Sequence, residues 1–259
     1  MKIPIYQVDA FADAVFRGNP AAVCPLESWL DDSLLQAIAA ENNLSETAFL
    51  VPRDEHYEIR WFSPKNEVDL CGHGTLAAAF VIFHYLDIHL SQVDFQTPGD
   101  WLTVSRDGAL LTMDFPARPP VACEVPDDLV KGLGATPLEV LKSRDYLAVF
   151  PSEDIVRALT PDLSLLSRLD APGIIVTAPG KNADWVSRFF GPREGIPEDP
   201  VTGSAHCTLV PYWAPKLRKK EFRALQLSER GGTLYCRDLG ERVRIAGEAV
   251  MYMEGTIII

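Results

Sequence analysis

Apolar and polar residues alternate along the first residues of the chain, which is typical of a half-buried β-strand. The segment Ile3–Phe11 follows this pattern, and the turn-forming loop Phe16–Pro20 comes after it. Asp31–Glu41 has acidic residues in its first turn and apolar residues at helical spacing, so it predicts a surface helix. Short apolar runs between turn-forming residues predict further strands. These are Thr47–Val51, Tyr57–Phe62, Phe95–Thr97, Leu102–Ser105 and Leu110–Phe115.

The segment Leu76–Tyr85 is apolar on every side, which predicts a buried helix. Pro116–Pro120 then interrupts the pattern and marks the best boundary between domains. We therefore predict two halves, 1–117 and 118–259. Strands are expected again near the end of the chain, and the sequence leaves open whether the final strand pairs with the first half or with the second. These strands are Val243–Ala246, Ala249–Tyr252 and Thr256–Ile259.

The two halves carry related segments. Arg60–Val68 resembles Arg188–Ile196 at an offset of 128 residues (188 − 60), with Arg, Phe and Pro recurring identically. Each copy is followed by a short glycine-containing stretch and then by an apolar run. A register without gaps places Cys71 opposite Asp199, and a register with one gap pairs the glycine turns instead. The sequence leaves both registers open.

The repeat predicts that each half has a strand leading into the start of a buried helix. The first N–H groups of a helix lack intrahelical partners and carry partial positive charge. If the two helix starts face one cleft, they form a site suited to a small carboxylate. A chain of net charge −12 can bind an acidic metabolite in this way, because backbone groups do the binding.

Composition limits the classes of function. The net charge of −12 argues against nucleic acid and anionic membrane surfaces as partners. No apolar stretch is long enough to predict a membrane span. The five scattered Cys residues fit reduced thiols in a cytoplasmic protein better than a disulfide framework. Glycine-rich nucleotide motifs and the serine hydrolase elbow are missing from the sequence, so no cofactor is predicted.

Three polar residues are candidates for chemistry, and each has a simpler interpretation. Glu46 is either an exposed loop residue or a general base whose pKa is raised by apolar walls. His73, between two glycines, either hydrogen-bonds the helix terminus or shuttles a proton. Asp199 either caps a helix that starts at Pro200 or lies in a loop above a helix that begins nearer Ser204, which we favour.

A zinc site would need Cys71, His73, His206 and Cys207 to converge. The spacings Cys-x-His and His-Cys are not those of structural zinc modules. We therefore predict no metal.

Four stretches taken together resemble the PhzF phenazine-biosynthesis family, within the diaminopimelate epimerase-like superfamily. They are Gly18–Val23, Leu44–Phe49, Asn66–His73 and Glu198–His206. Each is weak alone, but their combination in this order is specific, and the likeness covers nearly the full length.

The resemblance implies an α+β fold of two similar halves. Each half would be a curved, mostly antiparallel sheet wrapped around a central buried helix, with the site in the cleft between them. It also implies cofactor-free proton transfer at carbon and a homodimer. The family's acid/base glutamate maps onto Glu46, its site histidine onto His73 and its site aspartate onto Asp199. The residues mapped to substrate or anion binding are Cys71, Gly72, Gly74, Thr202, Gly203 and Ser204.

The sequence differs from its relatives at two points. Related two-base epimerases use one thiol from each half, whereas Asp199–Ser204 has no cysteine opposite Cys71. Gly74 stands where a slightly larger residue such as Ala is common, which we expect only to loosen the turn.

The expected function is therefore an isomerase that moves a proton between carbons of a small carboxylate, with Glu46 as the base. Two alternatives stay open. One is an amino-acid racemase or epimerase that uses Cys71 with Asp199, and the other is a carboxylate-binding protein without turnover.

Overall fold

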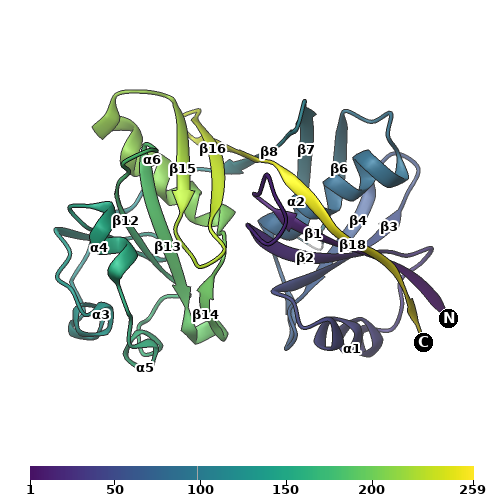
Figure 1. Cartoon of the computed structure of the whole chain (residues 1–259), viewed down its shortest axis with the longest axis horizontal. Helices are drawn as coiled ribbons and strands as arrows, with labels where there is room; N and C mark the ends of the chain where they lie inside the picture. The colour runs from purple at the N-terminus through teal and green to yellow at the C-terminus, as the bar shows by residue number, and fades with distance from the viewer. Residues whose placement is uncertain (98) are drawn as a thin grey trace. The chain divides into compact units, whose positions relative to one another are not determined.

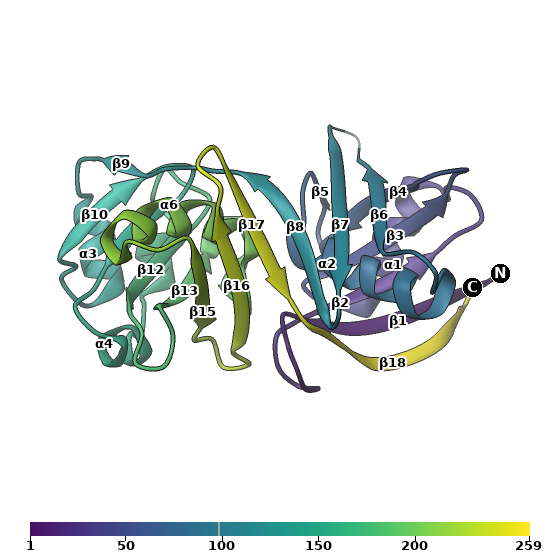
Figure 2. The ribbon, with the colours of Figure 1, turned by 90° about the horizontal axis from the view of Figure 1, so that it is seen from above.

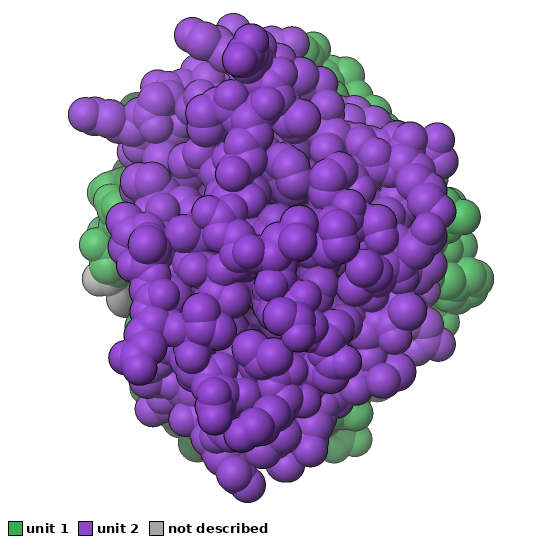
Figure 3. Space-filling view, turned by 90° about the vertical axis from the view of Figure 1, so that its left-hand side faces the viewer, with its two compact units in different colours: residues 1–114, 246–259 green, residues 115–245 purple. Residues whose placement is uncertain are grey.

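The computed structural model describes residues 1–97 and 99–259. They form two compact units, coloured separately in Figure 3: unit 1 comprises residues 1–114 and 246–259, and unit 2 comprises residues 115–245. The units differ from the predicted halves, 1–117 and 118–259, because the last strand pairs with the first and so belongs to unit 1. Among the described residues, no helix has the length and apolar character needed to cross a membrane.

The secondary structure of unit 1 contains the elements expected from the sequence pattern, and Figure 1 labels most of them. It also contains two strands that were not predicted, Asn19–Pro25, which begins within the expected loop Phe16–Pro20, and Glu67–Val68. Its helical elements are α1 (Asp32–Asn42), α2 (Gly72–Val81) and the π-helix η1 (Ile82–Leu86). Its strands are β1 (Lys2–Ala10), β2 (Asn19–Pro25), β3 (Glu46–Pro52), β4 (Tyr57–Phe62), β5 (Glu67–Val68), β6 (Gln92–Gln96), β7 (Trp101–Asp107), β8 (Leu110–Pro116) and β18 (Ala249–Ile258).

The sheet of unit 1 runs β18-β1-β2-β3-β4-β6-β7-β8, and β5 forms a short hairpin with β4. Its described pairings are antiparallel except β2–β3 and β4–β6, which are parallel. Figure 2 shows β18 lying along β1. The two predicted strands Ala249–Tyr252 and Thr256–Ile259 are one strand, β18, whose pairing with β1 contains a register shift at Gln7/Val8.

Helix α2 is the centre of unit 1. It packs against β1, β2, β3 and β7, so the sheet wraps around it. Its residues from His73 to Ala79 are all buried, which explains why the sequence shows no polar face. A second apolar cluster holds α1 against the other face of the sheet through Leu35, Ile38 and Phe49.

Unit 2 contains strands of similar length and more short helices. Its helical elements are α3 (Asp127–Leu133), α4 (Glu153–Ala158), α5 (Leu163–Leu166), α6 (His206–Leu217) and the 3-10 turns η2 (Pro192–Glu194) and η3 (Gly203–Ala205). Its strands are β9 (Val121–Ala122), β10 (Glu139–Lys142), β11 (Tyr146–Val149), β12 (Ile174–Pro179), β13 (Trp185–Gly191), β14 (Ile196–Asp199), β15 (Glu221–Gln226) and β16 (Gly232–Asp238). β17 (Arg242–Gly247) leads from unit 2 back to unit 1.

The sheet of unit 2 repeats the pattern of unit 1. Its order is β9-β10-β11-β12-β13-β15-β16, with β14 paired to β13. Here β11–β12 and β13–β15 are the parallel pairs, in the positions that β2–β3 and β4–β6 hold in unit 1. Helix α6 follows β14 as α2 follows β5. The sheet also surrounds α6, since its Tyr212 hydrogen-bonds Glu139 of β10 and its Trp213 hydrogen-bonds Thr177 of β12.

Equivalent side-chain contacts decide which register relates the two halves. Arg60 Nε lies 2.6 Å from Glu67 Oε1, and Arg188 Nε lies 2.7 Å from Glu198 Oε1. The arginines are 128 residues apart, but the glutamates are 131 apart (198 − 67). The hairpin β13–β14 therefore contains three more residues than β4–β5, and the register with one gap is the structural one.

The structural register pairs Cys71 with Thr202 and Gly72 with Gly203. Both capping residues have extended backbone, with φ −135° and ψ 104° at Cys71 and φ −112° and ψ 92° at Thr202. One turn later, Thr75 hydrogen-bonds the carbonyl of Cys71 and His206 hydrogen-bonds that of Thr202. Asp199 lies opposite Val68 (199 − 131) instead of opposite Cys71.

Candidate active site

Glu46 is placed by the connection between α1 and β3. Asn43 ends α1 in the left-handed conformation, with φ 49°, and three residues later Glu46 begins β3. Glu46 pairs in register with Ala21 of the parallel strand β2. Its exposed fraction is only 7%. The interpretation of Glu46 as an exposed loop residue is therefore wrong.

Cys71 and His73 are placed by the start of α2. Cys71 is the N-cap, and its Sγ accepts a hydrogen bond from the backbone N–H of Gly74 at 3.3 Å. His73 lies in the first turn of the helix and is 6% exposed. Because β3 is one of the strands that pack against α2, the first turn of the helix brings both side chains to the start of β3.

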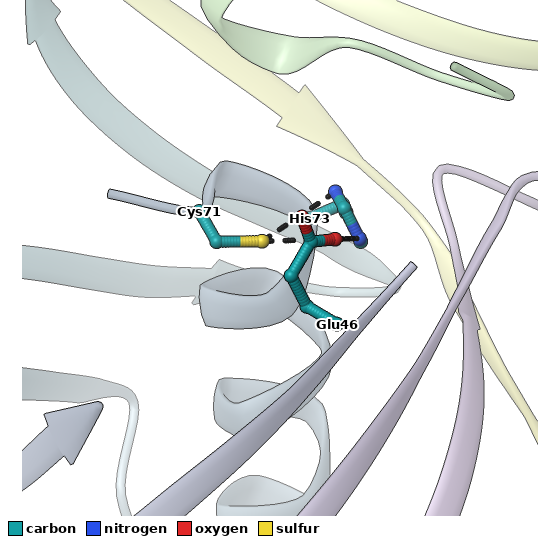
Figure 4. A group of neighbouring side chains, drawn as sticks. All are labelled: Glu46, Cys71 and His73. Carbon is teal, nitrogen blue, oxygen red and sulfur yellow. Dashed lines mark hydrogen bonds and ion pairs between the residues drawn. The ribbon is translucent and has the colours of Figure 1, made fainter. Parts of the chain in front are cut away.

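The three side chains meet in one buried cluster, shown in Figure 4. His73 Nε2 lies 2.8 Å from Glu46 Oε2. Cys71 Sγ lies 3.6 Å from Nδ1 and 3.8 Å from Nε2 of the same imidazole. In Figure 4 the thiol and the carboxylate both point toward the ring of His73. The cluster thus combines a carboxylate, an imidazole and a thiol within reach of one ligand atom.

The surroundings raise the pKa values of both the Cys71 thiol and the His73 imidazole, but for different reasons. Burial, with the Glu46 carboxylate second, raises the pKa of Cys71 to about 11, so the thiol stays protonated at neutral pH. Burial alone would lower the pKa of His73, but the neighbouring Cys71 and Glu46 groups more than offset this effect and hold that pKa well above its ordinary value. Protonation of His73 in this cluster is therefore more favourable than protonation of an isolated imidazole.

Asn19 is a member of this cluster that sequence reasoning did not select. Its side-chain amide lies 3.2 Å from His73 Nδ1 and fixes the ring on the side away from Glu46. Gly18 places it, since Gly18 has φ +66° and a Cβ there would meet the carbonyl oxygen of Ala10 at 2.1 Å. Asn19 lies within the family-like stretch Gly18–Val23, which was the available signal.

Gly74 is needed for space as well as for the turn. A Cβ at this position would meet Cys71 Sγ at 2.9 Å and Trp61 Cδ1 at 3.0 Å. The expectation that glycine here only loosens the turn is wrong, because the missing side chain makes room for the thiol and the buried indole.

The residues predicted from the second half lie together in unit 2. Asp199 is the last residue of β14 and is 8% exposed, so it lies in a strand and not in the loop expected above the helix. The hydroxyl of Thr202 donates a hydrogen bond to Asp199 Oδ2. Gly203 and Ser204 form the turn η3 directly before α6, close to the predicted start at Ser204.

Gln226, at the end of β15, is a further polar residue of this network, and it is 1% exposed. Its Nε2 donates to the carbonyl of Asp199 at 2.7 Å and to Thr202 Oγ1 at 3.1 Å. Its Oε1 accepts from the backbone N–H of Thr202 at 2.8 Å. No feature of the sequence pointed to Gln226, because a single amide in a strand carries no motif.

The structure brings together Glu46, Cys71 and His73 in unit 1, with Gly72 and Gly74 in the same turn of α2. It brings together Asp199, Thr202, Gly203 and Ser204 in unit 2. Two of the four residues considered as zinc ligands, His206 and Cys207, are buried at the start of α6. The Nδ1 atom of His206 hydrogen-bonds the carbonyl oxygen of Thr202.

Comparisons with known proteins place the chain in a family. The PhzC-PhzF family model, described as phenazine biosynthesis-like protein, matches residues 8–255. An "Uncharacterized isomerase" of Pseudomonas aeruginosa is 54% identical over 257 residues, which cover 99% of both chains. The crystal structure of a PhzF-family phenazine biosynthesis protein from Enterococcus faecalis has a TM-score of 0.98 at 44% identity and covers 100% of both chains.

A more distant structure shares the fold. A probable proline racemase from Agrobacterium radiobacter K84 is 8% identical, with a TM-score of 0.66 over 99% of this chain and 92% of that chain. The predicted epimerase-like α+β fold is confirmed, and so is the predicted class of enzyme, an isomerase. With matches over nearly its whole length, the chain belongs to the PhzC-PhzF family of phenazine biosynthesis-like proteins.

Proposed function

We propose that the protein is a cofactor-independent isomerase that moves a proton between two carbons of a small carboxylate. The observation that carries the proposal is the buried contact of 2.8 Å between Glu46 and His73 at the start of α2. A carboxylate held next to a cation in a largely water-excluded site can take a proton and return it, because no separate acid or base has to diffuse into the site.

In the proposed reaction, the Glu46 carboxylate removes a proton from one carbon of the substrate. The electron pair of that C–H bond moves into the adjacent unsaturated system, and negative charge develops on a substrate oxygen. The His73 imidazolium and the first N–H groups of α2 favour that charge. The protonated Glu46 then returns the same proton to a second carbon, so the enzyme ends in its starting state.

The thiol of Cys71 is the alternative base, as in a racemase that would pair it with Asp199. A base must be deprotonated to act, and the pKa of Cys71 is raised to about 11. This supports Glu46 over Cys71. The role of Asp199 in orienting the substrate stays a prediction, as does the identity of the carboxylate.

The test begins with an NMR screen of small carboxylates, which detects an isomer in which a hydrogen has moved from one carbon to another. On a substrate found in this way, we expect Glu46→Gln to lower turnover by at least about 10²-fold, the usual contribution of a general acid/base. Glu55→Gln is the matched control, because Glu55 is an exposed carboxylate. Full turnover in Glu46→Gln, or loss of turnover in Cys71→Ser with Glu46 dispensable, would reject the proposal.

A further inference from the structure

We propose that Glu46, Cys71 and His73 bind one thiophilic divalent cation, foremost Zn²⁺, and that the bound ion blocks Glu46 as a base. The binding part of this inference rests on the geometry alone, and only the blocking part rests on the proposed function. The sequence did not indicate this site, because Glu46 is far from the Cys-x-His pair along the chain and the fold brings it there.

The three side chains offer the donors that zinc prefers, namely a thiolate sulfur, an imidazole nitrogen and a carboxylate oxygen. One atom of each lies within 4.8 Å of the other two. Ligands of a tetrahedral zinc, at about 2.0–2.3 Å from the metal, lie roughly 3.3–3.8 Å apart. The observed 3.8 Å between Cys71 Sγ and His73 Nε2 falls at that spacing, and the 2.8 Å between Nε2 and Glu46 Oε2 requires a small opening.

Neighbouring groups contact two of the three ligands through polar atoms, as groups around a metal site commonly do. The backbone N–H of Gly74 donates to Cys71 Sγ and stabilises negative charge on the sulfur. The amide of Asn19 contacts Nδ1 of His73, and Nε2 faces Glu46 at 2.8 Å with Cys71 Sγ at 3.8 Å. A Cβ placed on Gly72 would meet nothing within 4 Å, so the first turn of α2 is not crowded at this position.

Zinc binding would release protons from the thiol and the imidazole to solvent and would convert Glu46 from a base into a ligand. The fourth coordination position stays open for water, because three protein ligands are available. A bound ion uses the carboxylate lone pair that would otherwise take the proton from the substrate carbon. We therefore expect the ion to inhibit proton transfer.

The test is titration of the metal-free full-length chain with Co²⁺, which reports a bound thiolate through charge-transfer absorption. We expect this absorption to saturate at one equivalent and to disappear when Zn²⁺ is added. Cys71→Ser should abolish it, and His73→Asn and Glu46→Gln should each weaken Co²⁺ binding at least about tenfold. Cys123→Ser is the matched control, because Cys123 is a free and partly exposed thiol outside the cluster. Circular dichroism checks that each variant is folded.

Absence of charge-transfer absorption, or its persistence in Cys71→Ser, would overturn the binding inference. If Co²⁺ and Zn²⁺ bind at the cluster but turnover is unchanged or rises, the blocking part fails and the binding part stands. If Glu46→Gln keeps full turnover, the proposed function fails, yet the absorption test still decides whether the cluster binds metal.

Discussion

At the scale of single residues, the central feature is a buried histidine whose pKa is raised in spite of its burial. Isolation from water disfavours imidazolium, but the neighbouring Cys71 and Glu46 groups reverse the balance, and the pKa of His73 is well above its ordinary value. A raised folded-state pKa stabilises the fold fully below the unfolded value of about 6.5, and this stabilisation is lost as pH rises through the folded pKa.

We therefore predict that the difference in unfolding free energy between wild type and His73→Asn is most favourable to wild type at pH 6 and shrinks as pH rises. Urea unfolding between pH 6 and pH 9 measures it, within a range where Cys71 stays protonated. Exposed His84→Asn is the matched control for loss of an imidazole outside the cluster. A difference that is constant across this range, or that grows with pH, would contradict the prediction.

Gly74 gives a second prediction at this scale. Replacing glycine by alanine inside a helix usually stabilises it by about 1 kcal/mol. At Gly74 the new Cβ would press on Cys71 Sγ at 2.9 Å and on Trp61 at 3.0 Å. We expect Gly74→Ala to lower stability by about 1–3 kcal/mol, the usual cost of overpacking. Gly132 is a helical glycine with a comparably tight Cβ position, against Leu166, so Gly132→Ala shows what overpacking costs away from the cluster. A gain in stability for Gly74→Ala, measured by urea unfolding, would refute this.

Residue-level reasoning from the sequence found Glu46 and His73 but not Asn19 or Gln226. The first two stand beside glycines or at a boundary between elements, where reactive groups are conspicuous. Asn19 and Gln226 make contacts with residues far away along the chain, Asn19 with His73 at a separation of 54 positions and Gln226 with Thr202 at a separation of 24. Such partners are defined by strand pairing, which a single sequence does not specify.

At the scale of elements, the two helix starts perform the same structural task with different chemistry. Both end an extended segment, both begin with glycine, and both receive a side-chain hydrogen bond one turn later, from Thr75 and from His206. The difference is that His206 can titrate. It is fully buried, and burial lowers its pKa to about 4.

His206 therefore predicts acid sensitivity of unit 2. A depressed folded-state pKa leaves stability intact above about 6.5, and stability falls as pH drops from there to about 4, because only the unfolded chain binds the proton. The shift corresponds to roughly 3 kcal/mol at pH 4. Gln at position 206 keeps a donor for Thr202 and does not titrate. Thermal unfolding at pH 7 and at pH 4 should show a smaller acid loss in His206→Gln than in wild type, and an equal loss would refute the assignment.

The elements themselves were largely predictable, because apolar periodicity reports burial directly. The expected strand at Tyr57–Phe62 matches β4 residue for residue, and the expected helix at Asp31–Glu41 differs from α1 by one residue at each end. The register between the halves was not predictable. The second hairpin carries its insertion within the stretch that matches Arg60–Val68, and only the paired contacts of Glu67 and Glu198 reveal it.

At the scale of the whole molecule, the chain leaves unit 1 after residue 114 and returns to it at residue 246. β18 is what returns, and it pairs along the full length of β1, from Lys2 with Ile258 to Ala10 with Ala249. It also contacts α2. Unit 1 therefore depends on the last residues of the chain, 246–259. Unit 2 has its own continuous core, which includes Leu129, Phe150 and Ile174.

This dependence predicts an uneven effect of truncation. A chain that ends at Glu248 lacks β18, leaves β1 without its outer neighbour and removes the contacts of β18 with α2. We expect a loss of more than about 4 kcal/mol, which corresponds to a fall in Tm on the order of 10 °C. A chain lacking only Ile258 and Ile259 is the matched control, because these residues are largely exposed and end the strand.

Hydrogen exchange measured peptide by peptide locates the damage. Peptides from residues 1–114 should lose protection in the chain that ends at Glu248, while those from residues 115–245 should keep it, because their core contains no residue of β18. Equal loss in both units would mean that the molecule unfolds as one cooperative body and that β18 stabilises unit 2 as strongly as unit 1. Unchanged protection everywhere would mean that β1 and α2 hold unit 1 together without the returning strand.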